Sequence, residues 1–113
     1  MGSVLFVEYP KCTTCKKARK WLEDSGVSFV DRHIVEDNPK AEELREWRSR
    51  GGHSMRRLFN KEKLDAGMSD EDAYELLASD GMLVKRPVLV GDDFAFFGFK
   101  EAEWAEALSI ELR

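Results

Sequence analysis

The first 35 residues carry the pattern that most restricts the fold. A short apolar run at residues 4–7 ends before Pro10, which predicts a buried strand followed by a turn. Small and apolar residues then recur at helical spacing from about Cys12 until Gly26, and a second β-rich run covers residues 27–35. Because parallel strands need a crossover between them, this order predicts a parallel strand, helix, strand unit.

The middle of the chain predicts two helices. Asn38 followed by Pro39 is typical of a helix start, and this helix is expected to end at about Gly51. Ser69, with Asp72 three residues later, resembles a capping box and predicts the start of the second helix.

A β-hairpin and a last helix complete the expected order. Apolar runs at residues 88–90 and 94–97 flank Gly-Asp-Asp, which is typical of a hairpin. Trp104, Leu108 and Leu112 then repeat every four residues, as on one face of a helix. The whole order predicts an α/β fold with a mixed sheet, and 113 residues are enough for one domain.

Charge and hydropathy exclude several classes of protein. The net charge is −4 and the pI is about 5.3, which argues against direct, sequence-independent binding of nucleic acid. The apolar run at residues 4–7 is far too short for a signal peptide or a membrane-spanning helix. We therefore expect a cytoplasmic protein without a membrane partner.

The two cysteines, Cys12 and Cys15, admit three interpretations. A zinc site would need two further ligands, and the histidines available, His33 and His53, match no metal-ligand spacing, so no metal is expected. In the second interpretation, both cysteines are small core residues of a helix. A C-x-x-C directly after a strand and a Pro turn is instead typical of a redox-active pair, which is the interpretation that we favour.

The expected position of the pair predicts different roles for its members. Near the first turn of the helix, free N–H groups favour the thiolate of Cys12, and Lys11, Lys16 and Lys17 would add positive charge. Cys15 falls on the apolar stripe of the helix, where we expect it to be buried. Cys12 is thus predicted to attack and Cys15 to resolve the product.

Lys85-Arg86-Pro87 is the second informative segment. A proline just before a strand either holds a cis bond that shapes the surface facing the thiols or is a plain trans proline at a sheet edge. Arg86 either directs its donors at an anion beside Cys12 or is a solvated surface arginine.

Four stretches of the chain together resemble the ArsC/Spx family of arsenate reductase-like proteins and redox regulators. The resemblance implies a thioredoxin-like fold of one domain over residues 1–113, with a helical insertion at about 38–80 and a cis bond before Pro87. The stretches are Y-P-K-C-T-T-C-K-K-A at 9–18, F-N at 59–60, L-L-A-S-D-G-M-L-V-K-R-P at 76–87 and G-F-K-E-A-E-W at 98–104.

The resemblance also implies a set of site residues. In the arsenate reductases a cysteine matching Cys12 attacks the oxyanion while three arginines hold it; Arg56 and Arg86 match two of these, and Lys100 stands near the third. Glu8 replaces the histidine of the reductases, and a carboxylate there would oppose an incoming anion. Cys15 replaces a serine and adds an internal resolving thiol, as in the Spx branch.

Two functions follow from the resemblance as expectations. The first is a thiol-dependent oxidoreductase that acts on a small oxyanion or a disulfide without a bound cofactor, with glutathione, glutaredoxin or thioredoxin as reductant. The second is an Spx-like regulator that binds the RNA polymerase α subunit and uses its C-x-x-C as a redox sensor.

Overall fold

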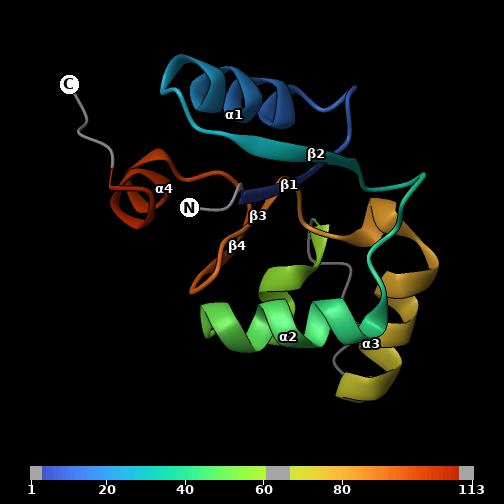
Figure 1. Cartoon of the computed structure of the whole chain (residues 1–113). Coiled ribbons are helices and arrows are strands. Elements are labelled where there is room, and N and C mark those ends of the chain that lie inside the picture. The colour runs from blue at the N-terminus through green and yellow to red at the C-terminus, as the bar shows by residue number, and fades with distance from the viewer. Residues whose placement is uncertain (1–3, 61–66, 110–113) are drawn as a thin grey trace.

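A four-stranded mixed sheet forms the centre of the molecule (Figure 1). The computed structural model describes residues 4–60 and 67–109. The strands are β1 (Val4–Glu8), β2 (Phe29–His33), β3 (Val88–Val90) and β4 (Ala95–Phe97). Their order in space is β2-β1-β3-β4, with β1 and β2 parallel and the other neighbouring pairs antiparallel. The predicted α/β class with a mixed sheet is therefore confirmed.

Helices cover both faces of this sheet. They are α1 (Thr13–Asp24), α2 (Ala41–Gly51), α3 (Asp70–Ser79) and α4 (Glu101–Ala107), with short 3-10 helices η1 (Met55–Leu58) and η3 (Gly81–Leu83). Helices α1 and α4 lie on one side of the sheet, and α2 and α3 lie on the other (Figure 1). None of the helices in the described ranges has the length and apolar character needed to cross a bilayer.

Neighbouring residues of β1 contribute to two separate cores. Phe6 packs with α1 and α4, and its ring lies 5.5 Å from that of Phe29 and 6.3 Å from that of Trp104. Val7 points to the opposite face and joins the core formed with α2 and α3. This alternation is the normal consequence of strand geometry, and it buries β1 on both sides.

The predicted helix boundaries are largely observed. Cys12 is the N-cap residue of α1, and Gly26, with φ of +74°, lies just beyond its end. Gly52, with φ of +66°, ends α2, and the Ser69 hydroxyl accepts a hydrogen bond from the Asp72 N–H at the start of α3. The C-terminal helix α4 contains Trp104 and ends at Ala107; Leu112 lies outside the described residues.

Asn38 does not have the predicted role at the start of α2. The N-cap residue is Lys40, whose N–H donates to Glu43. The Asn38 amide instead donates to the carbonyl oxygens of Leu77 and Ala78, both at 3.1 Å, and so satisfies the last turn of α3. The residues next to Asn38 look the same whether its side chain caps the helix that follows or a helix distant in the sequence. Local pattern therefore could not predict this contact with α3.

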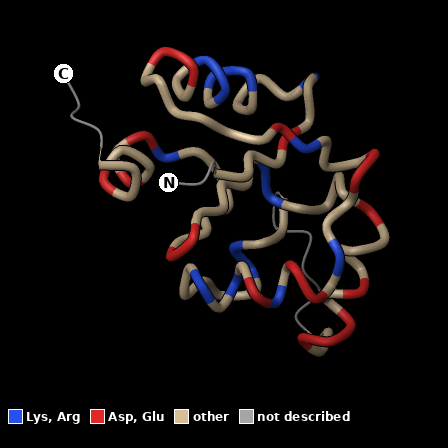
Figure 2. Tube along the Cα trace, in the orientation of Figure 1, with Lys and Arg blue, Asp and Glu red and all other residues tan. Residues whose placement is uncertain are grey.

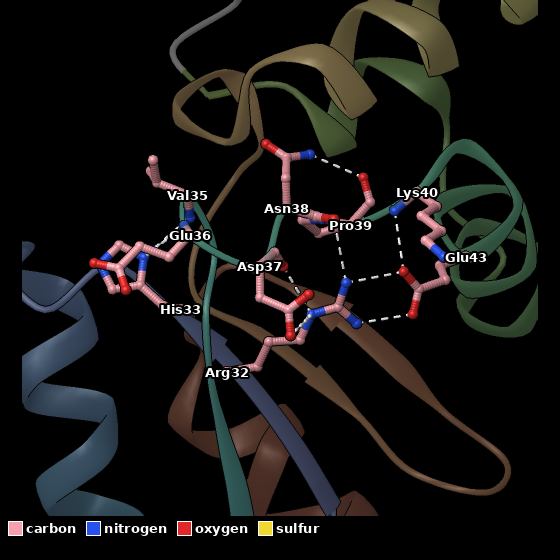
Figure 3. Close-up of polar contacts among 9 residues, drawn as sticks. All are labelled: Arg32, His33, Val35, Glu36, Asp37, Asn38, Pro39, Lys40 and Glu43. Atoms are coloured by element: carbon pink, nitrogen blue, oxygen red, sulfur yellow. Dashed lines mark hydrogen bonds and ion pairs between the residues drawn. The ribbon is translucent and has the colours of Figure 1, made fainter.

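Arg32 fixes the connection between β2 and α2 (Figure 3). Its guanidinium donates to both carboxylate oxygens of Glu43, at 2.8 and 2.9 Å, and to the carbonyl oxygens of Asp37 and Asn38. The side chain is only 13% exposed, so a two-bond charged pair of this kind is less weakened by water than a surface ion pair.

We predict that Phe6→Ala lowers the free energy of unfolding by about 3–5 kcal/mol, because it leaves a cavity between α1, α4 and the sheet. Val30→Ala on the edge strand is the control: Val30 is 56% exposed, and its loss should change stability by less than about 0.5 kcal/mol. Urea unfolding measures both values. Equal losses for the two variants would contradict this account of the core.

Candidate active site at the start of helix α1

Cys12 stands at the N-terminus of α1, between the end of β1 and the first helical turn. Its N–H donates to the Tyr9 carbonyl oxygen at 2.9 Å, which closes the turn after the strand. Its own carbonyl oxygen accepts from the Lys16 N–H at 3.0 Å, which begins the helix. As the N-cap residue it has extended backbone angles, and its side chain is half-buried.

The pKa of Cys12 is lowered from its ordinary value. Burial opposes this shift, but it is outweighed by hydrogen bonds from the N–H and the thiol of Cys15, by the positive charge of Arg86 and by the Thr14 N–H. Lys11, Lys16 and Lys17, predicted to favour the thiolate, are exposed, and basic residues recur along α1 (Figure 2). The favourable charge therefore comes from Arg86.

Cys15 has the opposite environment. It is fully buried on the inner face of α1, and burial raises the pKa of its thiol to about 12, with a further increase from the charges of Cys12 and Glu8. At neutral pH it is therefore a neutral donor toward the Cys12 sulfur. Both residues are free cysteines, and Cys15 is buried, as its position on the apolar stripe of the helix predicts.

Arg86 approaches the thiols from the segment before β3. Its guanidinium lies over the Tyr9 ring at 5.5 Å and donates to the Met82 carbonyl oxygen at 3.1 Å. Its Nε is buried and has no hydrogen-bond partner among the described residues. The Arg86–Pro87 peptide bond is cis. A buried guanidinium N–H without a partner is costly, so the site has an unused donor.

A cavity of about 340 Å³ opens beside Cys12 and Arg86. Four cationic side chains line it, and no acidic side chain is among the described residues of its wall. The four are Arg57, Lys85, Arg86 and Lys100. In a chain with a net charge of −4, this concentration of cations favours an anionic ligand next to a nucleophilic sulfur.

The structure brings most of the sequence-predicted site residues together and separates one from them. Cys12, Arg86 and Lys100 all line the cavity, and Cys15 lies behind Cys12. Arg56, which was expected to bind the anion, is exposed and is not part of the cavity wall; its neighbour Arg57 takes that place. Sequence reasoning also did not identify Lys85 as a wall residue.

Glu8 differs from the simple carboxylate expected from sequence. Its side chain is 2% exposed and accepts a hydrogen bond from Arg19 at 3.0 Å. Burial, together with its hydrogen bond to Asp31 and the charge of Asp31, raises the pKa of Glu8 to about 8. Glu8 is therefore largely protonated at neutral pH, which weakens the repulsion that a full charge would exert on an anion near Cys12.

Neither histidine joins the cysteines. The His33 Nδ1 accepts backbone N–H groups of Val35 and Glu36, and the His53 Nε2 lies 2.6 Å from the Ala95 carbonyl oxygen. Within the described part of the chain, no three side chains of the metal-binding types gather in a way that would hold a metal ion.

Several known proteins are similar to this chain over most of its length. The uncharacterised protein YusI of Bacillus subtilis is 42% identical, covering 92% of this chain and 97% of YusI. The global transcriptional regulator Spx of the same organism is 27% identical, covering 92% of this chain and 86% of Spx. A crystal structure of an ArsC family related protein from Bacteroides fragilis has a TM-score of 0.87 and 39% identity, over 93% of this chain and 97% of that one. The ArsC family model matches residues 7–107, and the chain therefore belongs to the ArsC family.

Proposed function

We propose that this protein is a thiol-dependent oxidoreductase similar to the arsenate reductases. One observation carries the proposal: a cysteine with a lowered pKa faces a cavity whose described charged residues are all cationic. A nucleophilic thiolate and a basic cavity suit a substrate that is itself an anion or carries anionic groups. The substrate class is thus a small oxyanion or an acidic disulfide.

The two thiols supply the two electrons of the reaction. With arsenate, the Cys12 thiolate attacks arsenic, an S–As bond forms, and one oxygen leaves as water after protonation. Cys15 then attacks the Cys12 sulfur, the S–As bond breaks with its electron pair remaining on arsenic, and arsenite leaves. With a disulfide substrate, Cys12 forms a mixed disulfide, which Cys15 resolves in the same way.

A second thiol system must restore the reduced pair. The product in the protein is a disulfide between Cys12 and Cys15, so a glutaredoxin- or thioredoxin-type protein, or glutathione, would reduce it by thiol–disulfide exchange. We place this cycle in the cytoplasm, where such thiol pools are kept reduced.

The cations of the cavity wall would hold the anion during the attack. Arg86 offers its unpaired Nε donor, and Arg57 and Lys100 reach the cavity from other segments of the chain. Hydrogen bonds from charged donors to an oxyanion are worth about 1.5–3 kcal/mol each. Two or three such contacts are enough to orient a small anion beside Cys12.

We predict that Cys12 alone reacts with iodoacetamide at neutral pH. The alkylation rate should rise with pH through a midpoint below that of an ordinary cysteine, because thiolate is the reactive form and the pKa of Cys12 is lowered. Arg86→Gln should move this midpoint to higher pH, since it removes a nearby positive charge. Cys12→Ser should abolish the reaction, whereas Cys15→Ser should retain it and accumulate mixed disulfides. A faster reaction at Cys15 would reverse the assignment of roles.

Turnover is the direct test of the proposed activity. Purified protein with arsenate, glutathione and glutaredoxin should produce arsenite, and Cys12→Ser should produce none. Arg57→Gln should raise KM for arsenate about ten-fold through the loss of one charged hydrogen bond. The adjacent Arg56→Gln is the matched control and should leave KM unchanged, because Arg56 lies outside the cavity wall. If only a disulfide substrate is turned over, the oxyanion part of the proposal is wrong.

The similarity to Spx favours a second candidate function, a redox-sensing regulator that binds the RNA polymerase α subunit. In that case the disulfide would alter a binding surface rather than complete a reaction. A pull-down with purified α subunit, under oxidising and under reducing conditions, should show binding that differs between the two states. Cys15→Ser, which cannot form the internal disulfide, should abolish the difference. Absence of binding in both states would eliminate this function.

A further inference from the structure

Lys85 is a cation of the cavity wall that the mechanism above does not use. It comes directly before Arg86, its side chain is half-buried, and it lines the same cavity as Cys12. Its backbone N–H donates to the Leu58 carbonyl oxygen at 2.7 Å, which joins this segment to the end of η1. Arg57 lies in η1, so this hydrogen bond brings a second cation of the wall toward Lys85.

The side chains of Lys85 and Arg57 end beside Gly98, the residue that follows β4. A Cβ on Gly98 would lie 3.1 Å from the Lys85 Cε and 3.9 Å from the Arg57 Nη2. Gly98 is held in place by two hydrogen bonds: its N–H donates to the Pro87 carbonyl oxygen at 2.8 Å, and its carbonyl oxygen accepts from the Trp104 indole at 3.2 Å. These two positive side chains, the cation pair, therefore meet at one fixed point of the cavity wall.

The cation pair lacks a carboxylate among the described residues. Neither cation forms an ion pair there, and no described acidic side chain lines the cavity. Five other arginines of the described ranges each contact a carboxylate; they are Arg19, Arg32, Arg45, Arg48 and Arg50. Two neighbouring positive charges without a counter-ion repel each other, and an anion bound between them would remove that cost.

The cation pair is separated from the start of α1 by the width of two strand spacings. In the sheet, Val7 of β1 is paired with Val88 of β3, and Val88 is paired with Phe97 of β4. Neighbouring strands are about 4.8 Å apart, so the end of β4, where Gly98 lies, is about 10 Å from the end of β1, where the turn to Cys12 begins. The cavity therefore offers a ligand two separate positions, one at the Cys12 sulfur and one at the cation pair.

The space between these positions suits an organic group. The cavity volume of about 340 Å³ lies within the range of about 300–1,000 Å³ that is typical of pockets for small organic ligands. Phe99 lines the cavity, and its ring lies 4.8 Å from that of Trp104. A small oxyanion at the sulfur leaves Lys85 unused, whereas a longer molecule with a carboxylate can occupy both positions.

We propose that Lys85 and Arg57 bind a carboxylate of a disulfide substrate while its S–S bond lies at Cys12; this inference rests on the thiol chemistry proposed above. The Cys12 thiolate attacks the nearer sulfur, a new S–S bond forms, and the S–S bond of the substrate breaks. The other half of the substrate leaves as a thiolate with the electron pair. Arg57 matches a carboxylate with two parallel N–H donors, and Lys85 adds a point charge. The cavity thereby selects disulfides that carry carboxylates over neutral ones.

Two chromogenic disulfides separate this selection from the reactivity of Cys12. The first, 5,5′-dithiobis(2-nitrobenzoate), carries a carboxylate on each half, and the second, 4,4′-dithiodipyridine, is uncharged at neutral pH. Each is mixed with Cys15→Ser protein, in which only the attack by Cys12 releases an absorbing product, and the rate constant of the release is measured. The ratio of the acidic to the neutral rate constant cancels any change in the pKa or exposure of Cys12.

In this background, Lys85→Gln should lower the ratio about ten-fold, because it removes one charged contact to the carboxylate, and Arg57→Gln should lower it at least as much. Lys85→Arg keeps the charge and should retain most of the original ratio. Arg56→Gln is the matched control. It removes the same charge from the residue next to Arg57, but Arg56 is exposed and lies outside the cavity wall, so the ratio should not change.

The outcomes distinguish this inference from the proposed function. An unchanged ratio in Lys85→Gln would overturn the inference and leave the proposed thiol chemistry intact. An equal loss in Arg56→Gln would also overturn it, since the selection would then come from the overall charge of the protein rather than from the cation pair. If Cys12→Ser reacts as fast as wild type with both disulfides, the proposed function fails, and the inference fails with it.

Discussion

The constraint on which the rest of the site depends is the position of Cys12 as the N-cap residue of α1, directly after the turn that follows β1. A helix N-terminus presents unpaired donors and a partial positive charge, which favour an anion at the N-cap position. The turn from β1 through Tyr9 places the cysteine there, and a short strand buried on both sides keeps that turn in position.

The two thiols differ because one faces a cationic cavity and the other is buried in the core. Toward the cavity, the positive charge of Arg86 stabilises a negative sulfur on Cys12. Toward the core, burial and Glu8 disfavour a negative sulfur on Cys15. The pKa values of two chemically identical side chains are thereby pushed in opposite directions, which is how one fold assigns them separate tasks. Burying Glu8 carries a cost to the fold, because its raised pKa makes stability fall as pH rises from about 4.5 toward 8.

The sequence was sufficient for the parts of the structure that depend on local pattern. The strand, helix, strand unit, the positions of Gly26 and Gly52 and the Ser69 cap follow from periodicity and from the conformations that glycine and serine favour. Which of two adjacent residues faces the site could not be predicted from local pattern. In η1 the buried residues Met55 and Leu58 are three apart, so both arginines between them are compatible with the pattern, and only tertiary packing decides that Arg57 faces the cavity. The burial of Glu8 depends likewise on α1 and β2 together.

The helical layer of α2 and α3 has a role at the site as well as in the core. Arg32 ties α2 to the edge of the sheet, and Asn38 ties the end of α3 to the same connection. The chain then passes through η3, where a Cβ on Gly81 would overlap the Ile34 carbonyl oxygen, so the close approach requires glycine. An isolated bridge between Phe59 and Val84 joins the end of η1 to the segment before Arg86. Arg57 lies two residues before Phe59, and Arg86 lies two residues after Val84. The packing of the helical layer therefore sets the separation of two of the cations that line the cavity beside Cys12.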